Sequence, residues 1–215
     1  MSIFTHNQQL DMTDYIVPYG TTEIEEEQFK DRDDLESVTI PDTVTVIGNS
    51  AFFGCNGLTK LSIPDSVTSV DFSAFSGCDG LTDVVIGRGL TSISDLMFFG
   101  CSELTNITIN ASITKIGDNA FGYCSSLEGF TIPDGVKSVG DQAFEGCVGL
   151  AIICIPASVE FLGGKAFDGC ESLTTINYSG TKAMWKAIEK GHNWKAGTGK
   201  FTDNCLDGSI GKLFS

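Results

Sequence analysis

The amino-acid sequence predicts a repeat solenoid, a fold in which one coil of backbone is copied head to tail. The evidence is a spacing of 23 residues that phenylalanine, leucine and cysteine each follow, in phase, over most of the 215-residue chain. Such self-similarity is typical of architectures in which each coil packs only against its neighbours. The series are Phe29, Phe52, Phe75, Phe98, Phe121, Phe144 and Phe167; Leu35, Leu58, Leu81, Leu104, Leu127, Leu150 and Leu173; and Cys55, Cys78, Cys101, Cys124, Cys147 and Cys170.

The composition indicates a folded, acidic protein. Hydrophobic residues make up 41% of the chain, enough for a continuous core. The formal net charge of −15 argues against nucleic acid or an anionic membrane as a partner, because both are negatively charged. No segment approaches the ~20 apolar residues that span a bilayer, so we expect no membrane insertion. The charge is uneven, since residues 1–180 carry a net −18 and residues 181–215 a net +3.

The first coil, residues 12–34, departs from the repeat and is predicted to cap the N-terminal end. Arg32 stands where later coils have cysteine, and acidic residues are abundant, as suits a terminal coil with one face in water. The alternative is that these carboxylates form an acidic docking patch. Residues 1–11 are predicted to be a flexible N-terminus.

Residues 58–80 illustrate the repeating coil. Leu61 and Ile63 alternate with polar residues, as expected of a strand with one buried side, and Pro64 ends the strand because it cannot donate to a ladder. Stacked coils should bring these strands into one parallel sheet. The inward-facing residues of the return path are Val67, Val70, Ala74, Phe75 and Cys78, the last three at the spacing of a short helical turn.

The six periodic cysteines are predicted to be buried free thiols, one in each coil. Stacked side chains in a parallel array point the same way, which suits packing better than the geometry of a disulfide, although disulfide pairing stays open. The sequence has neither a CxxC pair nor a Cys/His cluster, so we expect these cysteines to bind no metal.

Residues 181–215, after the final strand at 173–178, are predicted to form a C-terminal capping segment that begins with a helix. Thr181 is the candidate N-cap and Gly191 the candidate stop. Met184, Trp185 and Ile188 should share one helix face, Lys182, Lys186 and Lys190 should form a basic stripe, and a tail through Trp194, Phe201, Cys205 and Ile210 should close the core.

The repeating unit reads LxxVxIPxxVTxIGxxAFxxCxx and appears nearly verbatim between Leu35 and Cys55. This unit resembles the BspA-like (treponemal type) leucine-rich repeat. The resemblance covers residues 12–180, with the regular repeats at 35–180, and the segment GTKAMWKAI…NW is similar to the closing segment of such arrays in gut-dwelling Gram-positive bacteria. It implies a leucine-rich repeat solenoid with one parallel β-sheet, short helical or irregular return segments, and a helical closing segment.

The resemblance also carries functional expectations. Proteins of this kind are typically surface or secreted proteins of host-associated bacteria and mucosal protozoa. The resemblance implies adhesion or protein binding, with extracellular-matrix proteins among the partner types, and supplies no catalytic motif. It places the protein at the cell surface or outside the cell, whereas the start of the chain lacks the basic and apolar regions of a secretory signal and leaves a cytoplasmic location as the alternative.

Residues able to do chemistry are few. His6 and His192 are the only histidines, and neither belongs to a motif for nucleophilic catalysis. We therefore expect a non-enzymatic protein without a cofactor. Asp203, Asp207 and Gly208 partly match a calcium loop, but their spacing does not fit the EF-hand pattern and favours a turn.

The outward strand positions are mostly small and polar, with threonine dominant, which strand propensity alone can explain. Ile152, Cys154 and Val85 break this pattern, and an apolar group on a polar sheet can mark a contact site. The alternative is that the closing segment folds back over this coil and buries Ile152. The candidate ligand-binding residues on the sheet are Val85, Thr108, Thr131, Ile152, Cys154 and Thr175.

Two functions fit the sequence. The first is a binding module that presents its sheet to a protein or glycoprotein. The second is a structural spacer, a self-associating stalk or an intracellular scaffold, because an acidic first coil and a basic closing segment can attract each other head to tail.

Overall fold

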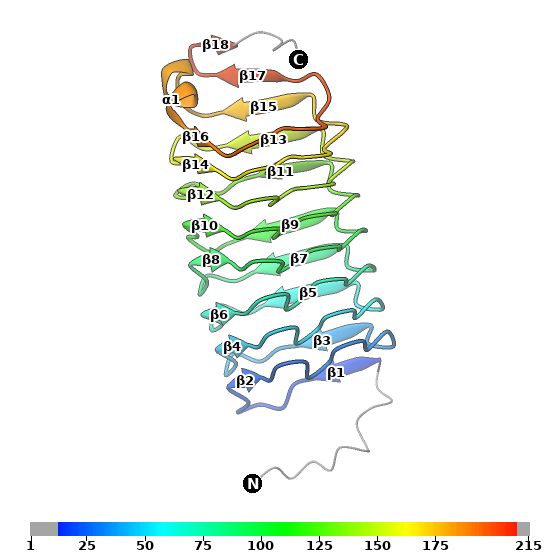
Figure 1. Cartoon of the computed structure of the whole chain (residues 1–215). Helices are drawn as coiled ribbons and strands as arrows, with labels where there is room; N and C mark the ends of the chain where they lie inside the picture. The colour runs from blue at the N-terminus through cyan, green and yellow to red at the C-terminus, as the bar shows by residue number, and fades with distance from the viewer. Residues whose placement is uncertain (1–12, 210–215) are drawn as a thin grey trace.

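The protein is a β-solenoid in which each coil contributes one longer and one shorter strand (Figure 1). The structure is a computed structural model and describes residues 13–209. The longer strands lie side by side along one side of the solenoid and the shorter strands along another. The predicted 23-residue coil is confirmed, because Val84 pairs with Ile107, 23 positions later, and the same register recurs along the array.

The longer strands form what we call the long-strand sheet. They are β1 (Asp14–Ile16), β3 (Ser37–Thr39), β5 (Lys60–Ile63), β7 (Asp83–Ile86), β9 (Asn106–Ile109), β11 (Gly129–Thr131), β13 (Ile152–Ile155), β15 (Thr175–Tyr178) and β17 (Thr202–Cys205). A hairpin strand, β18 (Gly208–Ser209), pairs antiparallel with β17.

The shorter strands have two residues each and pair in parallel behind the long-strand sheet, in two ladders within residues 13–209, one of the first three strands and one of the remaining five. They are β2 (Glu23–Ile24), β4 (Val46–Ile47), β6 (Ser69–Val70), β8 (Ser92–Ile93), β10 (Lys115–Ile116), β12 (Ser138–Val139), β14 (Phe161–Leu162) and β16 (Glu189–Lys190).

All pairings between coils are parallel, as predicted, but the ladder of the long-strand sheet is interrupted twice within residues 13–209. β3 is not paired with β5, and β9 is not paired with β11. Pro64 follows β5 and Pro133 lies just beyond β11. Proline has no N–H to donate to the preceding strand, so each interruption lies beside a missing hydrogen-bond donor.

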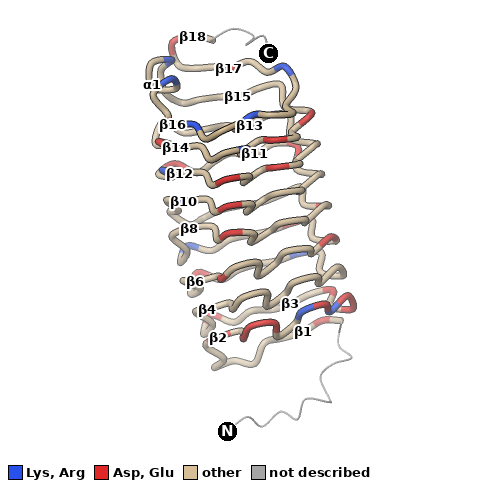
Figure 2. Tube along the Cα trace, viewed as in Figure 1, with Lys and Arg blue, Asp and Glu red and all other residues tan. Residues whose placement is uncertain are grey.

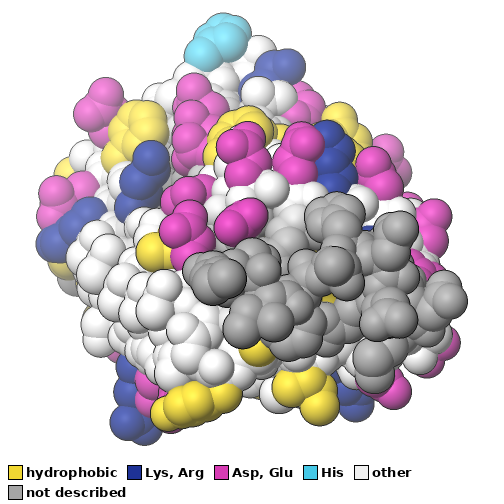
Figure 3. All heavy atoms as spheres, turned by 90° about the horizontal axis from the view of Figure 1, so that it is seen from below, with side chains coloured by type: hydrophobic (Ala, Val, Ile, Leu, Met, Phe, Trp, Pro, Cys, Tyr) yellow, Lys and Arg dark blue, Asp and Glu magenta, His cyan; other side chains and the backbone are white. Residues whose placement is uncertain are grey.

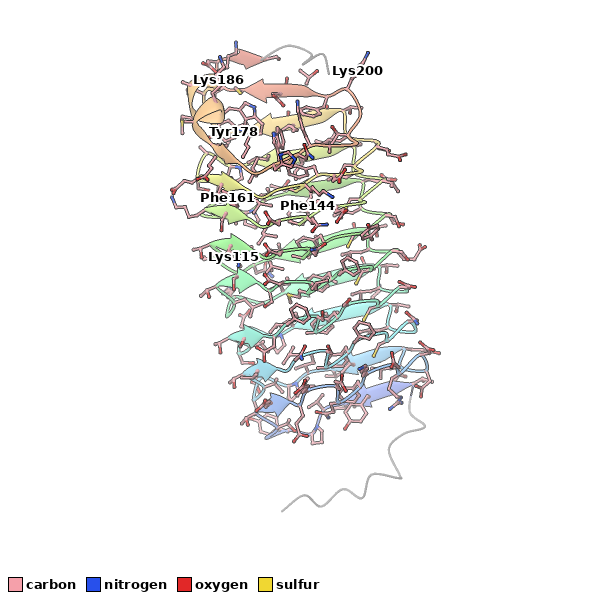
Figure 4. The ribbon with its side chains drawn as sticks, viewed as in Figure 1. Lys115, Phe144, Phe161, Tyr178, Lys186 and Lys200 are labelled. Atoms are coloured by element: carbon pink, nitrogen blue, oxygen red, sulfur yellow. The ribbon has the colours of Figure 1, made fainter. Side chains whose placement is uncertain are left out.

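The core consists of ladders in which equivalent side chains stack from coil to coil. The rings of Phe29 and Phe52 lie 4.9 Å apart at 11°, and those of Phe98 and Phe121 lie 5.7 Å apart at the same angle. Figure 4 shows Phe144 inside the solenoid as a member of this stack. One such coil could not bury its own apolar face, so stacking of neighbours creates the core.

The predicted ladder of free thiols is confirmed. All eight cysteines are free, and the six periodic ones are buried. Each buried Sγ–H donates to the carbonyl of a phenylalanine 26 residues earlier, as in Cys101 to Phe75 at 3.2 Å and Cys124 to Phe98 at 3.2 Å. The repeat therefore gives every thiol a hydrogen-bond acceptor.

The first coil buries apolar residues and exposes acidic ones. Ile24 and Phe29 are buried, while Glu25, Glu26 and Glu27 are exposed. This distribution is consistent with the predicted cap at residues 12–34, which stays a prediction. The flexible stretch predicted for residues 1–11, with His6, lies outside the described residues.

The predicted helix exists but ends earlier than expected. α1 runs from Lys182–Ala187, and the Thr181 side chain caps it by accepting from the Met184 N–H. The prediction of a stop at Gly191 was wrong, because Glu189–Lys190 leaves the helix to form β16 against β14. Pairing with the open edge of a sheet outweighs the helical propensity of a short segment.

Two predicted helix faces also need correction. Trp185 and Ile188 are buried as expected, but Met184 is exposed. Lys190 does not belong to a basic helix stripe; its Nζ donates to the carbonyl oxygens of Trp185 at 2.6 Å and Ile188 at 3.1 Å. Lys190 therefore caps the end of α1, where unpaired carbonyls and the helix dipole favour a cation.

The described part of the tail packs on the last coil, and its role as a cap stays a prediction. Phe201 is buried, Trp194 and Cys205 are partly buried against the core, and Ile210 lies outside the described residues. Tyr178, labelled near α1 in Figure 4, packs on Trp185 with ring centroids 5.2 Å apart. Aromatic side chains thus cover the end of the ladder.

Candidate binding surface on the long-strand sheet

The outward side of the long-strand sheet brings the sequence-predicted site residues onto one face. Successive side chains of a strand point to opposite faces, so the residues between the core positions point outward. Val85 pairs with Thr108, and Thr131 pairs with Cys154, so these four residues form successive rungs of one row. In the parallel row beside it, Ile152 pairs with Thr175. We call the outward side of β7 to β15 the sheet face.

The two apolar departures on the sheet face are exposed. The exposed fraction of the residue is 41% for Val85 and 45% for Ile152, while Cys154 is half-buried. The alternative in which the closing segment folds back over Ile152 was therefore wrong. The closing segment instead continues the stack, with β17 pairing beside β15.

A groove opens in the sheet face between β9 and β11. Its volume is about 700 Å³, within the range of ligand sites. Thr108, Thr131, Ile152 and Cys154 line it, so the groove brings together four of the six predicted residues, whereas Val85 and Thr175 lie on the flanking strands. The other lining residues are Thr105, Asn106, Ile107, Ile109, Gly129, Phe130 and Pro133.

The floor of the groove is apolar. Ile107 and Ile109 are core positions of β9, yet both are only partly buried, whereas the equivalent Val84 and Ile86 of β7 are buried. The missing pairing with β11 leaves these two isoleucines open to solvent on one side. Exposed aliphatic groups below a polar rim are the usual composition of a binding site.

Sequence reasoning missed this groove and the residues of its floor. The signal was present in Gly129 and Phe130, which interrupt two otherwise regular positions of the strand. The inward position taken by Phe130 is aliphatic in β3, β5, β7, β9, β13 and β15. A spacing argument treats such a replacement as another core residue, because it does not weigh the bulk of the ring.

A smaller pocket of about 260 Å³ adjoins the groove at the ends of β11, β13 and β15. It shares Thr131 and Cys154 with the groove and adds Asn177 and Tyr178. The Asn177 side-chain amide donates to the Cys154 Sγ at 3.8 Å, which holds the thiol on the rim between the two hollows. The hollow part of the sheet face therefore spans β9 to β15.

The groove is uncharged, and charge begins at its edge. Asp83 on β7 accepts from the Thr82 hydroxyl at 2.8 Å and from the Asn106 amide at 3.1 Å. These hydrogen bonds, that of Thr82 first, hold the pKa of Asp83 below its ordinary value, so its carboxylate stays ionised. A partner thus meets a neutral hollow bordered by a negative charge.

The remaining acidic residues serve the scaffold. Figure 2 shows Asp and Glu in stacked turns of the return path. In one such row the Asp118 N–H donates to Asp95 Oδ1, and the Asp141 N–H to Asp118 Oδ1, each at 2.9 Å. These carboxylates link neighbouring coils through backbone groups.

His192 and Asp207, the weaker candidates for chemistry, take part in hydrogen bonds within the scaffold. His192 is exposed, and its carbonyl accepts from the Lys165 N–H at 3.0 Å. Asp207 lies in the β17–β18 turn, where its Oδ1 accepts from the Lys182 N–H at 2.8 Å. Within residues 13–209, no group of three or more His, Cys, Asp or Glu side chains is placed to hold a metal ion.

Parallel strands, 23-residue coils and stacked leucine and phenylalanine ladders define the class of protein as a leucine-rich-repeat solenoid with an open sheet face. The family model described as "BspA type Leucine rich repeat region" matches residues 3–128 and 114–188, in 6 copies. The chain therefore belongs to the BspA-type leucine-rich repeat family.

Solved structures show the same architecture. A leucine-rich repeat protein from Bacteroides ovatus is 25% identical, with a TM-score of 0.69 over 89% of this chain and 54% of its own. The T. pallidum leucine-rich repeat protein is 29% identical, with a TM-score of 0.65 and 73% of each chain covered. One from Eubacterium ventriosum, 22% identical with a TM-score of 0.58, covers 87% of this chain and 43% of its own and shares the fold.

The chain spans about half the length of the B. ovatus protein. No match was found among curated proteins. Among residues 13–209, no helix has the length and apolar character needed to cross a membrane.

Proposed function

We propose that the protein is a non-enzymatic protein-binding module that presents its sheet face to a protein or glycoprotein outside the cell, in the manner of an adhesin. The observation that carries this proposal is the pair of exposed apolar residues, Val85 and Ile152, beside a hollow on an otherwise polar sheet. Membership of a leucine-rich repeat family supports protein binding. The short hydroxyl side chains of Thr108 and Thr131 lose little rotamer entropy when a partner docks.

The test is binding of the purified protein to a panel of extracellular-matrix and mucosal glycoproteins by surface plasmon resonance. The variant V85D/I152D should weaken any saturable interaction by about tenfold or more, because it buries charge at the contact. The matched control is V148D/M184D, which adds the same charge at exposed apolar residues away from the sheet face. Unchanged binding by a folded V85D/I152D protein would refute the sheet face as the contact.

The location outside the cell is part of this proposal and rests on the family resemblance. Intact source cells treated with a protease that cannot enter them should lose the protein, while a cytoplasmic marker should survive. Survival of the protein together with the marker would place it inside the cell and favour a scaffold role.

A second candidate is head-to-tail self-association into a spacer or stalk. Seen from below, the first-coil end shows Asp and Glu side chains gathered over part of its described surface (Figure 3). The closing segment carries Lys182, Lys186, Lys195 and Lys200, and Figure 4 labels Lys186 and Lys200 at that end. Light scattering at low salt should then detect oligomers that dissociate as salt screens the charges. A monomer at low salt and high concentration would exclude the stalk.

A further inference from the structure

The groove between β9 and β11 is a wedge that opens only on the sheet face. On the opposite side, β10 and β12 stay paired, with Lys115 opposite Ser138 and Ile116 opposite Val139. In the core, Phe121 and Phe144 stay stacked, and the Phe121 N–H donates to the Ala143 carbonyl at 2.8 Å. The two coils are therefore held together behind the groove and separated in front of it.

Phe130 is the inward residue of β11, and its ring reaches from its own coil to that of β9. Its ring packs beside the stacked Phe121 and Phe144, with centroids 5.0 Å from each, and is inclined at 50° and 60° to them. The equivalent inward residue of β13 is the aliphatic Ile153. Proline alone does not open the sheet, because Pro156 occupies in β13 the place of Pro133, and β13 pairs with β11.

The walls of the groove carry backbone groups without a ladder partner. The Asn106 N–H donates to the Thr82 carbonyl, which places the even-numbered residues of β9 toward β7. The Ile132 N–H donates to the Cys154 carbonyl, which likewise turns the even-numbered residues of β11 toward β13. The peptide groups of the odd-numbered residues, Ile107 and Ile109 on one wall and Gly129 and Thr131 on the other, face the groove, since β9 and β11 are not paired there.

We propose that this groove binds one large apolar side chain of an extended, uncharged peptide segment of the partner. The inference deepens the proposed function and rests on it, because it assigns the specificity site within the same sheet face. Ile107, Ile109 and Phe130 form the apolar floor that the side chain contacts. The free peptide groups on the walls hydrogen-bond the backbone of the segment, as in strand addition to an open sheet edge.

The chemistry of the lining favours a peptide over other ligands. The lining residues carry no charge, so neither a phosphate nor a charged side chain finds a counter-charge in the groove. The wall groups lie at strand spacing, which matches the repeat of an extended backbone. Gly129 leaves room for the backbone to approach, because a Cβ there would meet its nearest heavy atom, the Ile152 carbonyl oxygen, at 3.7 Å.

The test is an NMR titration of the full chain with acetylated and amidated threonine-rich peptides whose central residue is phenylalanine, leucine, alanine or lysine. At millimolar concentration, the phenylalanine and leucine peptides should shift the amide signals of Ile107, Ile109, Gly129 and Thr131. The alanine and lysine peptides should leave them unchanged, because neither fills the floor with an apolar group.

Two variants separate the groove from the rest of the face. G129W fills the groove, and F130L removes the aromatic ring from its floor, so both should abolish the shifts while the spectrum stays folded. The control is S62W, which adds the same ring on β5, outside the groove. Shifts that persist in G129W, that arise equally with the alanine peptide, or that appear only with an oligosaccharide or a fatty acid would overturn the inference, as would the absence of shifts at these four amides.

Failure of this inference is distinguishable from failure of the proposed function. If a panel glycoprotein binds through Val85 and Ile152 while G129W binds it normally, the groove inference falls and the binding function stands. If the peptides bind the groove but no panel protein binds the sheet face, the proposed partner class falls and the groove assignment stands.

Discussion

At the scale of single residues, the repeat decides the chemistry of the thiols by burying them. Burial raises the pKa of Cys101 to about 12 and raises that of Cys124 well above its ordinary range. A thiol with such a pKa stays protonated, and its Sγ–H donates to a phenylalanine carbonyl. These cysteines are therefore core residues and poor nucleophiles.

Thiol labelling of the native protein should discriminate the cysteines by position. We expect Cys154 and Cys205, which are partly exposed, to react with an aromatic disulfide reagent, and the six ladder thiols to react only after unfolding. Burial raises the pKa of Cys205, so Cys154 should react first. The variant C154S should remove the fast phase. Rapid labelling of more than two thiols without unfolding would contradict the buried ladder.

The phenylalanine ladder should be the most costly place to remove a side chain. Phe98→Ala leaves a cavity between two stacked rings and should lower the free energy of unfolding by ~3–5 kcal/mol. Phe72→Ala is the matched control, because Phe72 is 51% exposed and should change stability by less than ~0.5 kcal/mol. Urea unfolding followed by circular dichroism measures both. Equal effects at the two positions would refute the ladder as the main source of stability.

At the scale of elements, the closing segment shows how a regular array is ended. α1 covers the last coil with Trp185, whose Nε1–H donates to Asp203 Oδ2 at 3.0 Å. Asp203 is 1% exposed. Within residues 13–209, its Oδ1 is a buried side-chain atom that has no hydrogen-bond partner. Burial raises the pKa of Asp203, while the Trp185 hydrogen bond and then Lys195 and Lys190 act against that shift.

Asp203 should make the closing segment less stable as pH rises. A carboxyl whose pKa is raised by folding contributes stability that is fully present below its unfolded pKa and lost as pH rises through the folded value. Asp203→Asn keeps an acceptor for Trp185 and carries no charge, so it should raise the melting temperature at neutral pH and not at acidic pH. The control is Asp134→Asn, at an exposed turn. An equal change at both pH values would contradict the assignment.

The elements also show where sequence reasoning succeeds. Each 23-residue step gives a residue the same neighbours, so one coil predicts the burial of Leu61, Val84 and Ile153 alike. The end of α1 could not be predicted this way, because it depends on the open edge of β14, which recruits Glu189. The groove was missed for a similar reason, since the ring of Phe130 contacts Phe121 of the neighbouring coil, and a comparison of residues within one coil does not reveal that contact.

At the scale of the whole molecule, the array is a chain of coils coupled to nearest neighbours. Its free energy of unfolding is approximately the sum of the contributions of single coils and of the interfaces between them. The weakest interface therefore determines where the structure opens. The interface between the coils of β9 and β11 lacks strand pairing on the sheet face, although the shorter strands behind it remain paired. The groove that we propose as a peptide site is thus also one of the two points, within residues 13–209, at which the long-strand ladder lacks pairing.

Hydrogen exchange should locate this weak interface. The amides of Gly129 and Thr131 face the gap, so they should exchange faster than those of Asp83 and Val85, which hold the same positions in a strand that is paired with its predecessor. Phe130→Leu should let β11 pair with β9. Exchange at Gly129 and Thr131 should then slow toward the rates at Asp83 and Val85. The same variant should sharpen urea unfolding, because a continuous ladder couples the two halves of the array more strongly. Similar protection at all four amides in the unmodified protein would mean that the coils are joined across the sheet face, and the groove would then be closed in solution.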